Sequence, residues 1–392
     1  MADQIVIVGG AIMGSSLAWW LTELGHPPGA ITVVERDPTY AACATAFTNS
    51  CIRQQFGNPL NVAVSQFGVE FIRNFQTWIG DDRVPPIHFH TFGYLYLAGG
   101  EAEADRLRQA HGVQEAAGAG TRLMTPDEIA EKWPFYNLDG ILLGSHGTRD
   151  EGYFDGTTMF EWWRRLARER GVTYCEGEVT GIGQAGGRIT GVRLADGTTM
   201  GADIVVNAAG TRGAQIARLA GAADLPVEPR KRYTWIIEAA RPLETDLPLT
   251  IDPSGVHVRT DGQWYMAGAT PDHDPAVDPD DFAGDWSIWE DRVWPALATR
   301  IPSFEELRIK QYWVGHYDLN TFDANAIVGP YPGLEGFHIL NGFSGHGLQQ
   351  SPAMGRGLAE HIVHGRYVSL DLSPFSPDRL VAGERFTEMA VI

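Results

Sequence analysis

The sequence has little cysteine, little basic charge and no long apolar run. Its 392 residues include three cysteines, Cys43, Cys51 and Cys175, which form no CxxC pair, so neither a disulfide framework nor a zinc site is expected. No uninterrupted stretch of 18 apolar residues occurs, so we expect no integral membrane segment. Only 30 basic residues stand against 49 acidic ones, a formal net charge of -19. This argues against binding to nucleic acid, and an anionic substrate would need a local basic pocket.

We expect no secretory signal at the N-terminus. Met1 is followed almost at once by the strand-like run 5–8, which leaves no space for a basic region and an apolar core. We therefore expect a cytoplasmic protein. With 44% hydrophobic and 20% charged residues, the chain has the composition of a packed globular protein, and its length suits two domains.

A strand-helix-strand pattern opens the chain. The β-branched run "IVIV" (5–8) predicts a buried strand, residues 15–24 predict a helix, and "AITVVERD" (30–37) predicts a second buried strand. Such a βαβ unit is typical of the start of a dinucleotide-binding fold.

The turn within this unit carries a glycine pattern with one departure. Gly9, Ala11 and Gly14 fall at the G-x-G-x-x-G spacing, and Glu35 follows 21 residues after Gly14, where an acid can bind a ribose hydroxyl. The second glycine of the pattern lets the backbone approach a pyrophosphate, so Ala11 is tolerable if its φ is negative and its methyl points aside. The pattern favours a nucleotide site over an α/β crossover without a ligand.

Later segments predict a second layer of structure. Residues 58–80 have helical periodicity, "GVHVRTDGQWYMAGA" (255–269) predicts a hairpin at Asp261-Gly262, and residues 336–363 predict a strand, a glycine-rich turn and a helix. We expect the two ends of the chain to share one domain. The aromatic-rich, antiparallel strands between them would form a second, interleaved domain over a pocket, so the expected fold class is α/β (α+β).

Five motifs carry a family resemblance: "IVIVGGAIMGSSLAWWL", "VVERD", "FTNSCIRQQF", "VVNAAGTRGAQIA" and "GFSGHGLQQSPAMGRGLAEHIV". Together they resemble the D-amino acid oxidase superfamily, in its sarcosine oxidase and glycine oxidase branch. Within it, "IRQQF" and "HYDLNTFDANAIVGPYP" look most similar to the FAD-dependent oxidoreductase domain-containing subgroup, which includes a complex I assembly factor and bacterial amine oxidases. The resemblance implies FAD as the cofactor, and oxidation of a C–N bond in an amino acid or N-substituted glycine.

The resemblance also implies a division of the chain. A Rossmann-like FAD-binding domain is expected at residues 1–82, 148–225 and 318–392. It is interleaved with an antiparallel β-sheet substrate domain at residues 83–147 and 226–317.

Each part of the cofactor is assigned residues by the same resemblance. The N-terminal turn is expected to line the pyrophosphate, Glu35 to hold the adenosine ribose and Arg36 to lie beside the adenine, while the C-terminal turn wraps the pyrimidine edge of the flavin. The full set of implied FAD contacts is Gly9, Ala11, Ile12, Met13, Gly14, Glu35, Arg36, Thr48, Asn49, Ser50, Val179, Ala208, Gly210, Gly345, His346, Gly347, Leu348 and Gln349.

The C-terminal turn also has a physical reason to contact a flavin. A glycine-rich turn that opens a helix presents unpaired backbone N–H groups and a partial positive pole, which stabilise negative charge on a reduced flavin. A plain surface helix with a glycine-rich entry would explain Gly342, Gly345 and Gly347 but not the nearby His346 and Gln349. We therefore interpret this turn as a flavin contact.

Several family positions are changed in this chain. Gln349 stands where sarcosine oxidases have a carboxylate-binding lysine, and Tyr317 stands near where glycine oxidases have a carboxylate-binding arginine. Met266 replaces a second lysine that promotes reaction with oxygen, so the electron acceptor, oxygen or another, is left open. The last third of the chain has no cysteine, so attachment of FAD through sulfur is not expected.

Arg53 is the residue expected to bind the substrate carboxylate. It stands amid uncharged residues in "CIRQQF", and a fork-shaped guanidinium suits bidentate binding of a carboxylate. Tyr317 or Gln349 would assist this binding, and His346 or His316 could take a proton from the amine.

Other clusters are given smaller roles. His88 and His90 suggest no third ligand nearby, so no metal site is expected. Trp235 and Trp264 are expected near the substrate.

The sequence thus predicts an FAD-dependent oxidoreductase in which a hydride passes from the carbon beside nitrogen to flavin N5, giving an imine that hydrolyses. Secondary amines such as sarcosine or iminodiacetate-like compounds are the expected substrates, from the resemblance alone. Two alternatives stay open. One is a non-catalytic assembly or scaffold factor that keeps FAD. The other is an NAD-dependent dehydrogenase, in which the C-terminal turn would have no ligand to contact.

Overall fold

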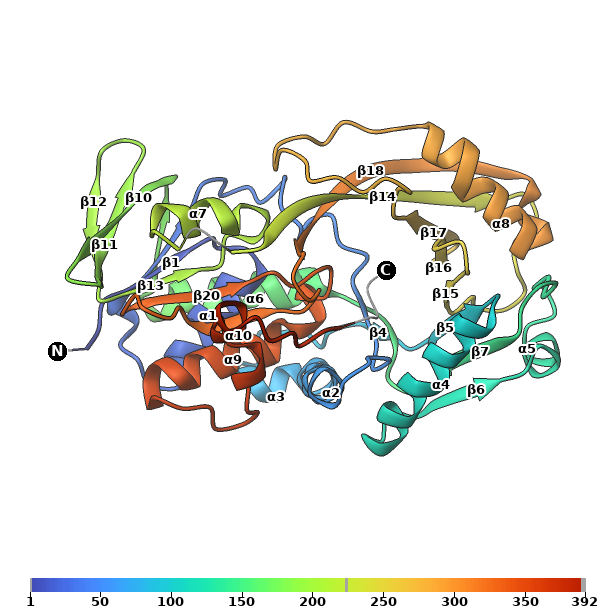
Figure 1. Ribbon diagram of the computed structural model, residues 1–392, viewed down its shortest axis with the longest axis horizontal. Helices are drawn as coiled ribbons and strands as arrows, with labels where there is room; N and C mark the ends of the chain where they lie inside the picture. The colour runs from blue at the N-terminus through green and yellow to red at the C-terminus, as the bar shows by residue number, and fades with distance from the viewer. Residues whose placement is uncertain (1, 223–224, 389–392) are drawn as a thin grey trace.

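Two large sheets lie next to each other along the long axis of the molecule (Figure 1). The computed structural model describes residues 2–222 and 225–388. The predicted FAD-binding ranges also include residues 1, 223–224 and 389–392, which lie outside the described residues.

The first sheet is mostly parallel and is built from both ends of the chain. Its central strands are short apolar runs buried on both faces, as expected for a sheet covered by helices. The strand order is β19 (Ile327–Pro330), β20 (Phe337–Asn341), β13 (Ile204–Asn207), β1 (Ile5–Val8), β2 (Ile31–Glu35) and β9 (Thr173–Glu176), with β19 antiparallel to β20.

Helices cover this sheet and bury the first hydrophobic core. Trp19, Phe71 and Trp163, from three different helices, meet there. The helices of this part are α1 (Ile12–Glu23), α2 (Pro59–Arg73), α3 (Phe75–Ile79), α6 (Gly156–Arg170), α7 (Gly213–Leu219), α9 (Gly347–His364) and α10 (Asp378–Ala382). The helices that contain Ser16 and Gly355, α1 and α9, approach each other closely, since a Cβ built on Gly355 would lie 2.2 Å from Ser16 Oγ.

The second sheet has eight strands, and its neighbours are antiparallel except β15 and β5. Tyr233, Trp235 and Ile237 alternate along one strand and bury one face in a second core, so the intervening side chains point to the opposite face. The strand order is β18 (Leu307–Asn320), β14 (Val227–Ala239), β17 (Trp264–Ala269), β16 (His257–Asp261), β15 (Leu249–Ile251), β5 (Tyr94–Ala98), β7 (Leu143–Gly147) and β6 (Thr121–Met124).

Figure 1 shows β14 and β18 as long paired strands that reach from the first sheet toward α8 (Trp294–Arg300). The other helices beside the second sheet are α4 (Glu101–Ala116) and α5 (Pro126–Lys132). Two small sheets complete the fold: β10 (Val179–Ala185), β11 (Arg188–Leu194) and β12 (Thr199–Gly201), and β3 (Cys51–Ile52), β8 (Gly152–Phe154) and β4 (Phe89–His90). Short helical turns lie at Pro28–Ala30, Gly210–Arg212, Trp289–Val293, Pro302–Glu305 and Ser373–Phe375.

The α/β (α+β) class is confirmed, and the predicted elements differ in detail. The hairpin at Asp261-Gly262 is confirmed, since β16 and β17 pair with Asp261 opposite Trp264. Residues 58–80 form two helices, because the chain leaves helical geometry at Asn74 (φ -110°, ψ 26°). The domain boundaries stay predictions. In the described part of the chain, no helix is both long and apolar enough to cross a membrane.

Candidate active site

A cavity of about 550 Å³ is lined by residues of both large sheets. The N-terminal turn lines it through Gly9 and Ala11, and the C-terminal turn lines it through Gly345 and Gly347. Two turns more than 300 residues apart therefore meet at one cavity. Its volume is in the range of small-molecule sites.

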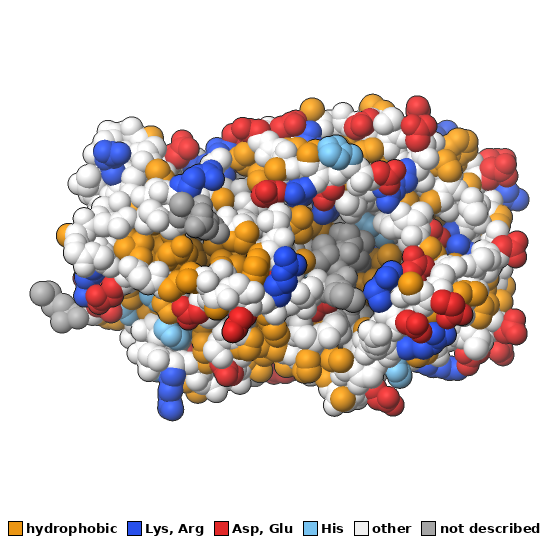
Figure 2. Space-filling model, in the orientation of Figure 1, with side chains coloured by type: hydrophobic (Ala, Val, Ile, Leu, Met, Phe, Trp, Pro, Cys, Tyr) orange, Lys and Arg blue, Asp and Glu red, His pale blue; other side chains and the backbone are white. Residues whose placement is uncertain are grey.

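Arginines line the cavity of a chain that is acidic as a whole. Figure 2 shows acidic side chains along the upper edge and right-hand end of one face, in keeping with the formal net charge of -19. Four arginines line the cavity: Arg36, Arg53, Arg212 and Arg232. The carboxylates of Glu35, Glu178 and Asp318 also line it, and Arg36, Arg212 and Arg232 pair with Asp280 or Asp274, so the cavity carries charges of both signs.

The N-terminal turn explains how alanine replaces the second glycine. Ala11 precedes helix α1 with φ -66° and ψ -161°, an extended conformation open to any residue, so the expected negative φ is confirmed. Gly9 has φ +99°, and a Cβ there would lie 2.5 Å from the Ala208 carbonyl oxygen. Glycine is thus required at position 9 and not at position 11.

Gly14 is the one implied FAD contact that lies outside the lining of the cavity. A Cβ on Gly14 would lie 1.9 Å from the Gly9 carbonyl oxygen. Its role in this structure is therefore to let α1 pack closely on the turn, which is the usual task of the third glycine.

Glu35 and Arg36 lie at one end of the cavity. The Glu35 carboxylate accepts hydrogen bonds from the N–H groups of Gly10 (2.8 Å) and Asp37 (2.9 Å), which fixes its position. Arg36 donates to Asp280 at 2.9 Å. Three further implied contacts, Val179, Ala208 and Gly210, also line the cavity.

The C-terminal turn opens helix α9 with His346 at its N-cap. Gly345 has φ +90°, and a Cβ there would lie 2.3 Å from the ring of Tyr317, so only glycine fits. The turn, together with Leu348 and Gln349, lines the cavity. Since α1 and α9 pack side by side, the positive ends of both helices point at the same space.

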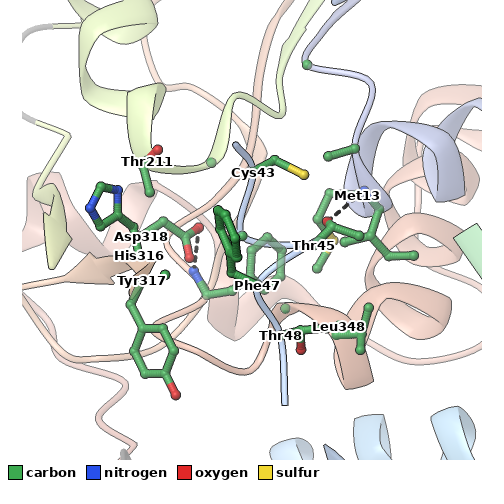
Figure 3. A pocket seen from close by; sticks show the side chains of 18 of the residues that line it. Met13, Cys43, Thr45, Phe47, Thr48, Thr211, His316, Tyr317, Asp318 and Leu348 are labelled. Carbon is green, nitrogen blue, oxygen red and sulfur yellow. Dashed lines mark hydrogen bonds between the residues drawn. The ribbon is translucent and has the colours of Figure 1, made fainter. Parts of the chain in front are cut away.

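Asp318 fixes the shape of this turn and is a residue that the sequence prediction missed. Its carboxylate accepts hydrogen bonds from the N–H groups of Gly342 (2.9 Å) and Phe343 (3.1 Å). Burial raises the pKa of Asp318 to about 6. In Figure 3, Asp318 and Tyr317 come from β18 on one side and Met13 from α1 on the other.

Arg53 is buried, 4% exposed, and lines the cavity beside His346. Its Nη2 lies 2.8 Å from His346 Nε2. A guanidinium only donates, so His346 Nε2 accepts and this ring is neutral. The Arg53 guanidinium also lies over the Phe56 ring at 4.8 Å. Burial opposes its charge, but Tyr96 and other neighbours raise the pKa of Arg53 above its ordinary value.

Two side chains hold the backbone around Arg53 in place. Gln349 Oε1 accepts the Arg53 N–H at 3.0 Å, so this side chain positions Arg53. Glu151, fully buried, accepts from the Gln54 N–H (2.7 Å) and from Gln55 Nε2 (3.0 Å). Burial raises the pKa of Glu151 to about 7.

The remaining implied contacts and two missed residues complete the lining. Ile12, Met13, Thr48, Asn49, Ser50, Tyr317 and His316 line the cavity. So do His257 and Arg232 of the second sheet. Arg232 is part of the basic cluster Arg230-Lys231-Arg232 in the sequence, whereas nothing local distinguishes His257.

Other expected residues lie elsewhere. Trp235 is fully buried in the second core and stacks on Tyr312, and Trp264 is likewise outside the lining, so their predicted place near a substrate is wrong. His90 pairs with Asp246 at 2.8 Å. Within the described ranges, no group of three or more metal-ligating side chains is found.

Comparisons with known proteins show the family and the fold of this chain. The family model described as "FAD dependent oxidoreductase" (DAO) matches residues 4–361. Over 424 residues the chain is 38% identical to "FAD-dependent oxidoreductase domain-containing protein 1" of Bos taurus, covering 100% of this chain and 87% of that protein. It is 24% identical to mitochondrial sarcosine dehydrogenase of Homo sapiens, covering 93% of this chain and 40% of that protein. Among solved structures, L-proline dehydrogenase from P. horikoshii matches with a TM-score of 0.84 and 26% identity, covering 98% of this chain and 99% of that one.

Proposed function

We propose that this chain, which belongs to the DAO family of FAD-dependent oxidoreductases, oxidises the C–N bond of an amino acid or N-substituted glycine. Sarcosine- or iminodiacetate-like secondary amines are the preferred candidates. The observation that carries the proposal is Arg53, a buried guanidinium that lines the cavity at the turn opening α9. A buried cation facing an enclosed site suits a carboxylate, which every substrate of this class carries.

The residues present fit FAD, the family's cofactor. A Cβ on Gly9 would collide with the Ala208 carbonyl and a Cβ on Gly345 with the Tyr317 ring, and both glycines line the cavity through their backbone. Helices α1 and α9 add the N–H groups of their first turns. We assign the diphosphate to the α1 turn, the ribose to Glu35 and the flavin to residues 345–349.

The chain's own residues bind and orient the amine. When bound, FAD supplies at N5 the acceptor for the hydride that leaves the carbon beside nitrogen. Arg53 would hold the carboxylate, with Tyr317 at the same wall, and so fix which carbon faces the cofactor. His346 Nε2 already accepts from Arg53, so the amine would bind without its extra proton rather than give one to this nitrogen. The product imine then hydrolyses in water.

An anaerobic panel of amines tests this function. The purified holoprotein is mixed with sarcosine, proline, glycine, iminodiacetate and primary amino acids without oxygen, and flavin absorbance is followed. Loss of the oxidised spectrum with an N-substituted glycine is expected. Air is then admitted to identify the electron acceptor. A rapid return of flavin absorbance indicates oxygen, and a slow return indicates another acceptor. Absence of bleaching by every amine would favour a non-catalytic role for the bound FAD.

A further inference from the structure

The cavity wall formed by the second sheet holds buried polar atoms that lack a hydrogen-bond partner in the described part of the chain. Two of them, His257 Nδ1 and Arg232 Nε, are nitrogens of that sheet, and the third, Asn49 Oδ1, is an acceptor on the adjoining segment before β3. All three residues line the cavity, and His257 is only 9% exposed. Since buried polar side chains in native proteins nearly always have partners, three such atoms at one wall point to a ligand.

Strand register brings these side chains to one face. Thr234 of β14 lies opposite Gly268 of β17, and Gly268 lies opposite His257 of β16. Arg232 is two residues before Thr234 and therefore points to the same face. A Cβ on Gly268 would lie 2.5 Å from His257 Nε2, so glycine leaves the space that the imidazole occupies.

Asn49 joins the group from the segment that leads to Arg53. Its Nδ2 lies 3.2 Å from His257 Nε2. Arg259 donates to the Asn49 carbonyl at 3.1 Å and so fixes its backbone. Burial, with the charges of Arg259 and Arg232, lowers the pKa of His257 to about 4. The ring is therefore neutral at pH 7 and offers a hydrogen bond without a charge.

Arg232 keeps one edge of its guanidinium available. Its Nη1 donates to the Lys231 carbonyl (2.7 Å) and to Asp274 (3.0 Å). The guanidinium lies over the Tyr317 ring at 4.5 Å. Among the described residues Nε has no hydrogen-bond partner, and the parallel N–H groups of an Nε–Nη2 edge match a carboxylate.

The two arginines reach the cavity from different elements. Arg53 follows the short strand β3 and bonds to His346 at the start of α9. Arg232 belongs to β14, and it contacts the face of the Tyr317 ring, which also lies against the Gly345 turn. Two arginines that come from different elements therefore line the same cavity.

We propose that Arg232 and His257 form a second carboxylate subsite, so that the substrate is an amine bearing two carboxylates, one bound by Arg53 and one by Arg232. Asn49 Nδ2 donates to His257 Nε2 and so leaves the ring proton on Nδ1, from which it can be donated to the carboxylate. This inference rests on the proposed function, because it names the substrate class of the same cavity. A single-carboxylate amine such as sarcosine would leave the second subsite unfilled.

Unreactive ether analogues test the subsite by binding alone. Diglycolate carries two carboxylates and methoxyacetate one, and both replace the amine nitrogen by oxygen. Their dissociation constants for the holoprotein are measured from the perturbation of the flavin spectrum at equal ionic strength. We expect diglycolate to bind at least about tenfold more tightly, and Arg232→Gln to abolish that preference while methoxyacetate binding stays within about twofold.

Arg230→Gln is the matched control, because Arg230 lies on the same strand, pairs with Glu228 and is outside the lining. It should keep the full preference. If Arg232→Gln does not retain FAD, Arg232→Lys replaces it and is expected to lose most of the preference, since an ammonium cannot bind bidentately. Equal affinity of the wild type for both analogues, or an equal loss in Arg230→Gln, overturns the subsite.

The two proposals can fail separately. If diglycolate is preferred but no amine bleaches the flavin, the oxidation fails and the subsite stands. If mono- and dicarboxylic amines reduce the flavin equally well and the analogues bind equally, the subsite fails and the oxidation stands.

Discussion

Three buried side chains fix the backbone at and next to Arg53. Gln349 holds its N–H, Ser65 donates to its carbonyl oxygen, and Glu151 holds the next two residues. A charged side chain so far from water is stable only with such partners. The cationic head therefore lines the cavity while its backbone is fixed from behind.

Replacing Arg53 tests its role in substrate binding. Arg53→Ala should raise the amine concentration needed for half-maximal flavin reduction by about tenfold to a hundredfold, because a charge-assisted pair is lost, while FAD content stays at the wild-type level. Arg53→Lys should recover part of the loss. The measurement is anaerobic stopped-flow reduction together with the flavin-to-protein absorbance ratio. Loss of FAD in both variants would show that Arg53 is structural.

Burial of Glu151 makes the folded protein less stable as the pH rises. Its pKa is raised from 4.5 to about 7 by burial, so the folded state binds this proton more tightly than the unfolded state. The contribution to stability is complete below pH 4.5 and is lost as the pH rises through 7.

Glu151→Gln removes that titration. Between pH 5.5 and pH 8 the free energy of unfolding of the wild type should fall by about 2 kcal/mol more than that of Glu151→Gln, because only the wild type loses this proton. Urea unfolding of both proteins with excess FAD at the two pH values provides the comparison. Parallel changes in wild type and variant would mean that Glu151 is already ionised in the folded protein.

The two glycine turns can line the cavity because glycine stands at the positions where the backbone requires it. Gly9 and Gly345 have positive φ and no space for a side chain, whereas Ala11 has a negative φ. Helices α1 and α9 can then start at the same cavity, since Gly355 lets them touch.

A matched pair of substitutions in the first turn tests this account. Gly9→Ala should lower the free energy of unfolding by at least about 2 kcal/mol and remove FAD, because the new methyl meets the Ala208 carbonyl and φ is positive. Ala11→Gly should bind FAD within about twofold of the wild type. Thermal unfolding and FAD titration measure both effects. Equal damage from the two substitutions contradicts the role given to each position.

The sequence was informative where local chemistry decides the structure. The βαβ unit, the glycine spacing and the hairpin at Asp261-Gly262 depend on neighbours in the chain, and the structure has them. His257 and Asp318 could not be predicted, because their place depends on which strands become neighbours. Trp235 was misplaced for the same reason: only the register shows which face of β14 is buried in the core.

Ion pairs tie a loop of the second sheet to residues next to the first sheet. The segment between β17 and the helical turn at Trp289–Val293 carries Asp280, which pairs with Arg36 and Arg212 at the end of the cavity assigned to the adenosine. Beside it, Asp281 pairs with Lys231 at 2.8 Å. The segment, here called the strap, therefore lies at this end of the cavity, where Pro279 joins the lining and ion pairs hold its neighbours Asp280 and Asp281.

Neutralising Asp280 should loosen this strap. Asp280→Asn is expected to speed the loss of FAD about threefold at low salt, and the difference should shrink at about 0.5 M salt, because partly exposed ion pairs are screened. The rate is read from the rise of free-flavin fluorescence after dilution. Asp139→Asn makes the same charge change at an exposed position outside the lining and should dissociate like the wild type. A salt-independent difference would exclude the ion pairs as its cause.

The proposed oxidation requires that both glycine turns contact one FAD molecule. A crystal structure of the holoprotein measures this directly. We predict one FAD per chain, with its diphosphate within hydrogen-bond distance of the N–H groups at residues 11–13 and its flavin ring within that distance of residues 345–349, next to Arg53. An FAD bound at the first turn with its ring directed away from the second would contradict the account.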